Sequence, residues 1–305
     1  MAVLATSDLS LPPEMADGVF KKTLTGSAVA TLIGAVPQKF GKGQLMTLTG
    51  RPRAEYVGEG QQKGSSSITF APKQTTPKKV QVTLRFNEEV KWADEDDQLG
   101  VLQECADESA LALARALDLG VFHGINPLAG VATALIPVGD RIGTTTNAVE
   151  ITSGTAGTPD LVIEQAVGMV IGDQWVPDGI AFDPTYAWTI ATARYDDGRK
   201  KYPELGFGQN VTSFEGLKAY SSSTVSGLPE ATANTGVKAI VGQWDLLRWG
   251  VQKEIPVEMI EFGDPDGQGD LKRNNQIALR TEVVYGWGVM DLDGFAVVTD
   301  KVANS

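Results

Sequence analysis

Cysteine and histidine are almost missing from this 305-residue chain, which holds one of each, Cys105 and His123. A single cysteine excludes an intrachain disulfide framework. The chain also lacks the ligands of an ordinary zinc site, and any Ser-His-Asp triad would have to use His123. We expect Cys105 to be a small core residue, and His123 to contact the last carbonyls of a predicted helix. The sequence therefore predicts no catalytic residue, no metal site and no cofactor.

Long apolar runs and excess positive charge are also absent. No window approaches the roughly 18 uncharged apolar residues of a membrane span, and residues 1–15 lack the basic and apolar regions of an export signal. The net charge of −12 argues against a sequence-reading nucleic-acid binder, because affinity for phosphate depends on clustered Lys and Arg. We interpret the basic clusters Lys78-Lys79, 199–201 and Lys272-Arg273 as solvated faces or ion pairs between subunits.

Two ligand-binding loops are excluded by their residues. No GxxxxGK[ST] phosphate loop occurs in the chain. The stretch 264–275 resembles a calcium loop at Asp264, Asp266 and Asp270, but Asn275 stands where the bidentate Glu belongs. We therefore interpret this stretch as a hydrophilic surface loop.

Residues 51–123 are the most informative part of the chain. They form a long polar segment followed by one predicted amphipathic helix. Residues 52–77 are rich in Gly, Ser, Gln and Lys, and structureless loops of this length are uncommon unless they have a function. The alternation over 80–86 predicts a strand with one buried face. Apolar spacings of three and four from Leu99 to Val121 predict a helix, with the acidic run 94–97 at its N-terminal end. The pattern indicates a subunit that clasps its neighbours.

The rest of the chain predicts an extended arm and a second unit of short helices and strands. Residues 1 to about 30 show no sustained period, which favours an arm lying on a partner. Thr158-Pro159 and Asp183-Pro184 each predict the start of a helix. Further strands are expected at 217–220, 255–262 and 277–285.

The order of short motifs resembles that of the major capsid proteins of tailed bacteriophages, which have the Hong Kong 97-type α+β fold. The match covers nearly the whole chain through AEYVGEG (54–60), the alternating strand, the long helix ending FHG (122–124), AGVATA (129–134), AFDPTYAW (181–188), YDDGR (195–199), EGLKAYSSS (215–223), VGQWD (241–245) and RTEVVYGWGVMDLDGFAVV (280–298). No internal repeat is visible.

The resemblance implies a domain organisation and a set of partners. The implied parts are an N-terminal arm (1–34), a peripheral domain (35–123) with an E-loop (51–78) and a spine helix (96–122), an axial domain (124–247), a peripheral return (248–292) and an axial C-terminal strand (293–305). Pentamers and hexamers are expected to close into an icosahedral virion capsid around phage double-stranded DNA, bound without sequence specificity. The capsid would be assembled in the bacterial cytoplasm. A separate scaffolding protein, a portal and decoration proteins are further expected partners, and a membrane is not.

In this family the E-loop lies over an adjacent subunit, which selects the candidate inter-subunit contacts. They are Arg51, Arg53, Glu55, Tyr56, Glu59, Lys63, Phe70, Lys73, Lys272, Arg273, Asn274 and Asn275. Some relatives form Lys-Asn isopeptide bonds, for which Lys63 or Lys73 with Asn274 or Asn275 are the candidates, although ordinary non-covalent contacts are preferred. Two alternatives stay open: an encapsulin-type nanocompartment shell, and a soluble hydrolase acting through His123 or acidic residues.

Overall fold

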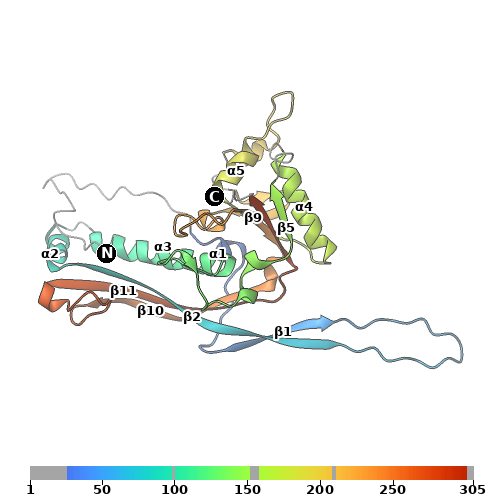
Figure 1. Ribbon diagram of the computed structural model, residues 1–305, viewed down its shortest axis with the longest axis horizontal. Helices are drawn as coiled ribbons and strands as arrows, with labels where there is room; N and C mark the ends of the chain where they lie inside the picture. The colour runs from blue at the N-terminus through green and yellow to red at the C-terminus, as the bar shows by residue number, and fades with distance from the viewer. Residues whose placement is uncertain (1–25, 98–99, 152–157, 208–210, 301–305) are drawn as a thin grey trace.

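The computed structural model describes residues 26–97, 100–151, 158–207 and 211–300 (Figure 1). They form an elongated unit built on a four-stranded sheet and a more compact unit built on a six-stranded sheet. Most of the expected arm, 1–25, and Leu99 at the expected helix start lie outside the described residues. Among the described helices, none combines the length and apolar character that crossing a bilayer requires.

The elongated unit consists of a long antiparallel sheet with one helix lying lengthwise on it (Figure 1). Its strands follow the order β1 (Gly43–Gly50), β2 (Thr69–Asn87), β11 (Gln276–Val289) and β10 (Leu247–Ile260). The lengthwise helix is α3 (Val101–Phe122), and α2 (Glu88–Asp97) lies near one end of the sheet. At 1.5 Å per residue, α3 is about 33 Å long.

The long helix begins later than the sequence predicts. Gly100, with φ 67°, stands directly before α3, and the acidic run 94–97 ends α2 instead of opening the long helix. The expected interaction of that run with the positive end of the helix dipole is therefore wrong. The apolar spacing in the sequence runs on across the break at Gly100, because α2 and α3 pack on the same small core. In that core Val90 of α2 and Val101 of α3 pack with Phe86. Cys105 lies half-buried against this core, as expected.

The compact unit has a mixed sheet with two helices beside it (Figure 1). Its strands follow the order β5 (Ala148–Ile151), β12 (Phe295–Asp300), β9 (Val237–Gly242), β6 (Gly179–Phe182), β8 (Leu217–Ser221) and β7 (Ser213–Phe214). The helices are α4 (Pro159–Gly172) and α5 (Pro184–Ala191), so both proline starts are confirmed. Asp183 caps α5, because its Oδ1 accepts from Thr185 N at 2.9 Å.

Short elements connect these parts. They are α1 (Ala28–Leu32), β3 (Ile125–Asn126), β4 (Val131–Ala132) and the 3₁₀ turns η2 (Val138–Asp140), η3 (Ile142–Thr144), η4 (Pro203–Leu205), η5 (Ser223–Val225), η6 (Trp244–Leu246) and η7 (Lys272–Asn274).

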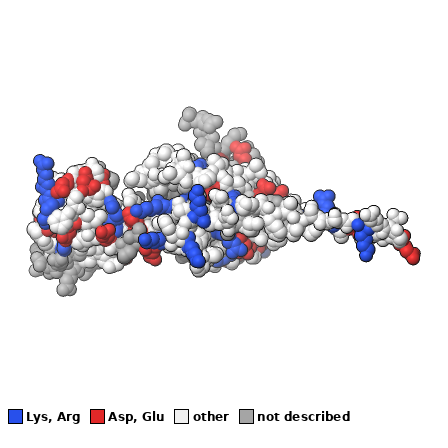
Figure 2. All heavy atoms as spheres, turned by 90° about the horizontal axis from the view of Figure 1, so that it is seen from below, with Lys and Arg blue, Asp and Glu red and all other residues white. Residues whose placement is uncertain are grey.

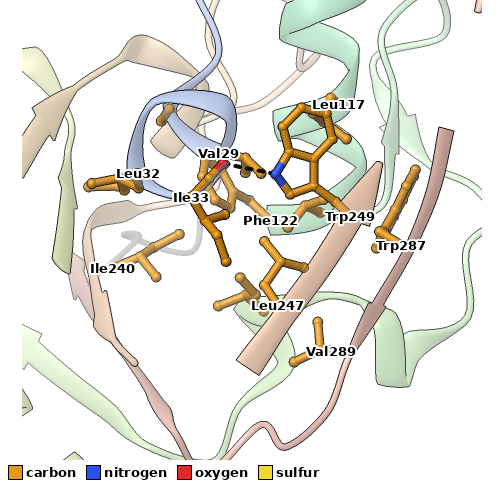
Figure 3. Packing of buried hydrophobic residues seen from close by; sticks show 14 of the residues in the cluster. Val29, Leu32, Ile33, Leu117, Phe122, Ile240, Leu247, Trp249, Trp287 and Val289 are labelled. Atoms are coloured by element: carbon orange, nitrogen blue, oxygen red, sulfur yellow. Dashed lines mark hydrogen bonds between the residues drawn. The ribbon is translucent and has the colours of Figure 1, made fainter. Parts of the chain in front are cut away.

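One apolar core joins both units and includes α1 (Figure 3). It gathers buried residues from α1 and the following Ile33, and from α3, β9, β10 and β11: Val29, Leu32, Ile33, Leu117, Phe122, Ile240, Leu247, Trp249, Trp287 and Val289. The indole Nε1 of Trp249 donates to the Ile33 carbonyl at 3.1 Å. Residues 28–32, expected in an arm on a partner, therefore form a helix that packs on its own chain, because Ala28, Val29 and Leu32 supply a buried apolar face.

A buried carboxylate fixes α1 to the long helix. Asp118 of α3 accepts four hydrogen bonds, from Ser27 Oγ (2.5 Å), Ala28 N (2.7 Å), Val29 N (3.1 Å) and Thr224 Oγ1 (2.7 Å). Burial raises the pKa of Asp118 to about 6, although these hydrogen bonds act in the opposite direction. At the other end of α1, Lys218 Nζ donates to the carbonyls of Thr31 and Leu32.

Candidate assembly interface

The β1/β2 hairpin projects well beyond the body of the molecule (Figure 1). Its strands pair from Gly43↔Thr75 to Gly50↔Thr69, whereas β2 pairs with β11 only from Thr76 onward. The expected loop over 52–77 is therefore too long, since β2 begins at Thr69. Outside the body the hairpin is a two-stranded ribbon, and such a ribbon is marginally stable in water without further contacts.

The end of the hairpin, residues 51–68, keeps its two limbs side by side. Arg53 N donates to Ser66 Oγ at 2.7 Å, Gly64 N donates to Glu55 Oε1, and Gln61 N closes a turn on the Gly58 carbonyl. Six predicted contact residues lie here, all exposed: Arg51, Arg53, Glu55, Tyr56, Glu59 and Lys63. Figure 2 shows charged side chains gathered toward the tip, while the hairpin surface nearer the body is mostly uncharged.

The ribbon has an inner face toward its own body and an outer apolar face. On the inner face Lys73 Nζ donates to the Gly139 carbonyl at 3.0 Å, and Thr47 Oγ1 lies 4.0 Å from Met290 Sδ. The register Met46↔Pro72 and Leu48↔Phe70 places Met46 and Phe70 together on the opposite face. Their side chains are 62% and 56% exposed, respectively. The sequence identified Phe70 but missed Met46, because β1 shows no clear alternation.

The remaining predicted contacts lie at the other end of the molecule. Lys272, Arg273, Asn274 and Asn275 belong to the loop between β10 and β11, far from the hairpin tip (Figure 1). Lys272 Nζ lies 3.6 Å from Glu88 Oε1, and Asn275 Nδ2 donates to Glu89 Oε1 at 2.6 Å. Within one chain the two predicted groups do not meet, so any contact of Lys63 or Lys73 with this loop requires a second copy.

An arginine holds the calcium-like part of that loop. The guanidinium of Arg85, on β2, donates to the carbonyls of Gln268 (3.0 Å) and Gly269, and it lies 3.2 Å from Asp266 Oδ1 and 3.8 Å from Asp264 Oδ1. A protein cation thus compensates the acidic side chains that suggested calcium. In the part of the chain that the structure describes, no three His, Cys, Asp or Glu residues are grouped to hold a metal.

His123 is a partly buried structural residue. Its Nε2 lies 2.9 Å from the Val225 carbonyl, and only its backbone N donates to the Leu119 carbonyl, so the expected side-chain contact with the helix end is wrong. The side chain turns toward η5, where it contacts Val225, and its ring lies edge-on to that of Phe122. Burial lowers the pKa of His123 to about 4. The adjacent cavity of about 360 Å³ has no Ser, Cys or acidic residue among its described lining residues.

The basic pair Lys78-Lys79 divides between surface and interior. Lys79 Nζ is at the surface, 2.8 Å from Glu282 Oε2, as an ion pair of the expected kind. Lys78 is buried, however, which contradicts a solvated face or a pair between subunits. The alternation of β2 turns neighbouring side chains to opposite faces, and that of Lys78 meets Asp140.

A projecting ribbon with an uncovered apolar face defines a structural subunit that contacts other copies. No protein-family model matches the chain. A solved structure from Mycobacterium phage Ogopogo is 51% identical, with a TM-score of 0.88 over 98% of this chain and 100% of that one. The probable major capsid protein gp17 of Mycobacterium phage L5 is 22% identical over 95% of this chain and 89% of its own. The capsid of an empty GTA particle has the same fold, at 10% identity, with a TM-score of 0.63 and 95% of each chain covered.

The chain belongs to the major capsid proteins of tailed bacteriophages. It has the Hong Kong 97-type α+β fold and is a structural protein of the virion capsid, where copies of it form an icosahedral shell. This assignment replaces the two alternatives, the encapsulin shell and the soluble hydrolase.

Proposed function

We propose that the chain assembles as pentamers and hexamers that form a shell around phage double-stranded DNA. In this shell each hairpin lies on a neighbouring subunit and links the two. The observation that carries this proposal is the outer hairpin face, on which Met46 and Phe70 stay exposed in the single chain. In this assignment the hairpin is the E-loop, α3 the spine helix, the elongated unit the peripheral domain and the compact unit the axial domain. The arm was predicted over residues 1–34; because residues 28–32 pack on their own chain, we propose an arm that ends before them, and the other domain boundaries stay predictions.

The outer face supplies the apolar part of the contact. Burying a side chain such as Phe70 or Met46 contributes roughly 1.5 to 3 kcal/mol. The charged tip, with Arg51, Arg53 and Glu55, selects the position on the neighbour, since charges at an interface contribute more to specificity than to affinity. Covering this face also stabilises a ribbon that is marginal by itself.

The loop at the opposite end is the second proposed contact. Lys272, Arg273, Asn274 and Asn275 are exposed beside α2, so they are accessible to a neighbouring subunit. We assign them non-covalent contacts. Boiled particles should then give one band at 32.4 kDa on a denaturing gel, whereas a ladder of multiples would establish Lys-Asn crosslinks. A scaffolding protein, a portal, decoration proteins and DNA bound without sequence specificity complete the proposed partners.

The hairpin contact is tested by the double variant Met46→Ser/Phe70→Ser. Its matched control is Gln44→Ser/Gln74→Ser, which changes two exposed polar residues on the same face. The first variant should fold like the wild type, yet require an at least about hundredfold higher subunit concentration to form particles, because two side chains worth roughly 1.5 kcal/mol or more each are lost. The control should assemble normally. Sedimentation and electron microscopy measure both effects, and wild-type assembly by the serine variant would contradict the proposed contact.

A further inference from the structure

The hairpin is joined to the body at one point along β2. Thr75 is the last residue paired with β1, and Thr76 is the first residue paired with β11. The crossing is tightly packed, since Thr75 is buried and a Cβ on Gly43 would lie 2.6 Å from Thr75 Oγ1. The segment before β1 is tied to the sheet as well, since Gly41 N donates to Gln252 Oε1 at 3.1 Å and Gln38 Nε2 donates to the Gly286 carbonyl at 3.2 Å. Only β2, however, continues from the ribbon into the sheet as a paired strand, so contacts of β2 beside this point help to set the direction of the ribbon.

A buried lysine lies next to the crossing. The side chain of Lys78 is 7% exposed, and its Nζ lies 3.4 Å from Asp140 Oδ2 and 4.0 Å from the centroid of the Trp287 ring. The same Nζ donates to the carbonyls of Thr76 and Trp287, both at 3.4 Å. Asp140 and Trp287 are buried as well. We call these three residues, Lys78, Asp140 and Trp287, the Lys78 cluster.

The cluster connects the crossing to two other elements. Trp287 Nε1 donates to the Asp140 carbonyl at 3.1 Å, which ties β11 to η2. The Trp287 ring lies against α3 at Gly120, where a Cβ would lie 2.9 Å from Cη2. The neighbouring Gly139 carbonyl accepts from Lys73, on the ribbon itself. The turn η2 thus holds β2 on both sides of the crossing, through Lys73 and through Lys78.

Stability alone does not require a charge pair at this place. Burial lowers the pKa of Lys78, an effect that the Asp140 carboxylate opposes. A buried ion pair pays a desolvation cost of several kcal/mol, and well-packed apolar residues in its place are often equally or more stabilising. A charge pair adds orientational specificity, because its hydrogen bonds form only in a few relative orientations of the two groups. Apolar side chains can pack in many orientations.

We propose that the ion pair between Lys78 and Asp140, which lies against the Trp287 ring, fixes the angle at which the hairpin leaves the body. That angle determines which surface of a neighbouring subunit the hairpin reaches. The inference rests on the proposed hairpin contact. It concerns the direction of the ribbon, whereas the Met46 and Phe70 variants test its outer face, so the two ideas fail separately.

The test compares Lys78→Met with Lys79→Met. Both replace a lysine of β2 by an unbranched apolar residue, but Lys79 forms only the surface pair with Glu282. In a Cys105→Ala background, spin labels at Gly58→Cys on the tip and Gln103→Cys on α3 report the hairpin angle as a distance distribution. The wild type and Lys79→Met should show the same narrow distribution. Lys78→Met should show a broadened or shifted one and an about tenfold higher concentration for particle formation.

Further measurements keep the proposal falsifiable. Unfolding of unassembled subunits shows whether Lys78→Met remains folded, and the double variant Lys78→Met/Asp140→Asn removes any unpaired carboxylate that destabilises the single variant. A folded variant of either kind with the wild-type distance distribution would overturn the proposal. An altered distribution in the folded double variant would support it. Lys79→Met altering the distribution equally would also overturn it, because the effect would then belong to the strand and not to the cluster.

Discussion

The two parts of β2 lie in different environments although they form one continuous strand. Residues 76–87 pair with β11, and Phe86 is buried in a core with Val90 and Ile277. Residues 69–75 pair only with β1, and Phe70 remains more than half exposed. The inner part has its apolar contacts within the chain, whereas the outer part has an apolar face that the proposed function assigns to a neighbouring subunit. On that proposal Phe86 contributes to the free energy of folding and Phe70 to the free energy of assembly.

Truncating each Phe gives the largest expected difference between the two parts. Phe86→Ala should lower the free energy of unfolding by about 3 to 5 kcal/mol, because it leaves a cavity in a packed core. Phe70→Ala should change it by less than about 0.5 kcal/mol, because its side chain contacts mainly solvent in the subunit. Denaturant unfolding of unassembled subunits measures both. Equal destabilisation would show that the outer ribbon is part of the folding core.

The pH dependence of stability extends the comparison, because the body contains a buried carboxylate, Asp118, and a partly buried imidazole, His123, whose titrations have opposite effects. The pKa of Asp118 is raised from 3.8 to about 6, so the folded state binds a proton more readily than the unfolded state and stability rises as pH falls through this window. The pKa of His123 is lowered from 6.5 to about 4, so stability falls as pH falls through nearly the same window. Each shift corresponds to roughly 3 kcal/mol.

These two contributions should nearly cancel between pH 6.5 and 4 in the wild type. His123→Gln, which keeps a donor for the Val225 carbonyl, removes one of them. Relative to the wild type, the variant should then gain up to about 3 kcal/mol of stability as the pH is lowered across that range. Unfolding midpoints at a series of pH values measure the gain. Parallel pH profiles for the two proteins would contradict the assigned pKa of His123.

The same contrast explains which parts of the fold were readable from the sequence. Strand residues 80–86 alternate visibly, and the helix starts at Pro159 and Pro184 are marked by local signals, because each such pattern reflects a buried face or a cap. The outer ribbon carries only a weak signal: its inner face over residues 69–75 is partly buried at Ala71 and Lys73 and fully buried only at Thr75, and none of these residues is strongly apolar. The break at Gly100 was missed because apolar spacing records which face is buried and does not record backbone continuity.

The candidate site shows the same limit. Exposed residues such as Tyr56 and Lys63 were placed in the hairpin through the resemblance, and the structure does place them there. The burial of Lys78 depends on Asp140 and Trp287, which are distant in the sequence and come close only in the folded chain. No local pattern distinguishes Lys78 from Lys79. Met46 became visible only through its register with Pro72.

The smallest expected effect on the subunit concerns Tyr56, whose side chain is fully exposed at the hairpin end. Tyr56→Ser should leave the free energy of unfolding of the subunit unchanged within about 0.5 kcal/mol. In assembled particles it should lower the melting temperature, because each copy loses an aromatic contact of roughly 1.5 to 3 kcal/mol if that ring is buried against a neighbour. Calorimetry on subunits and on particles separates the two results. A particle that melts like the wild type would place Tyr56 outside the contact and confine the apolar part of the interface to the ribbon face of Met46 and Phe70.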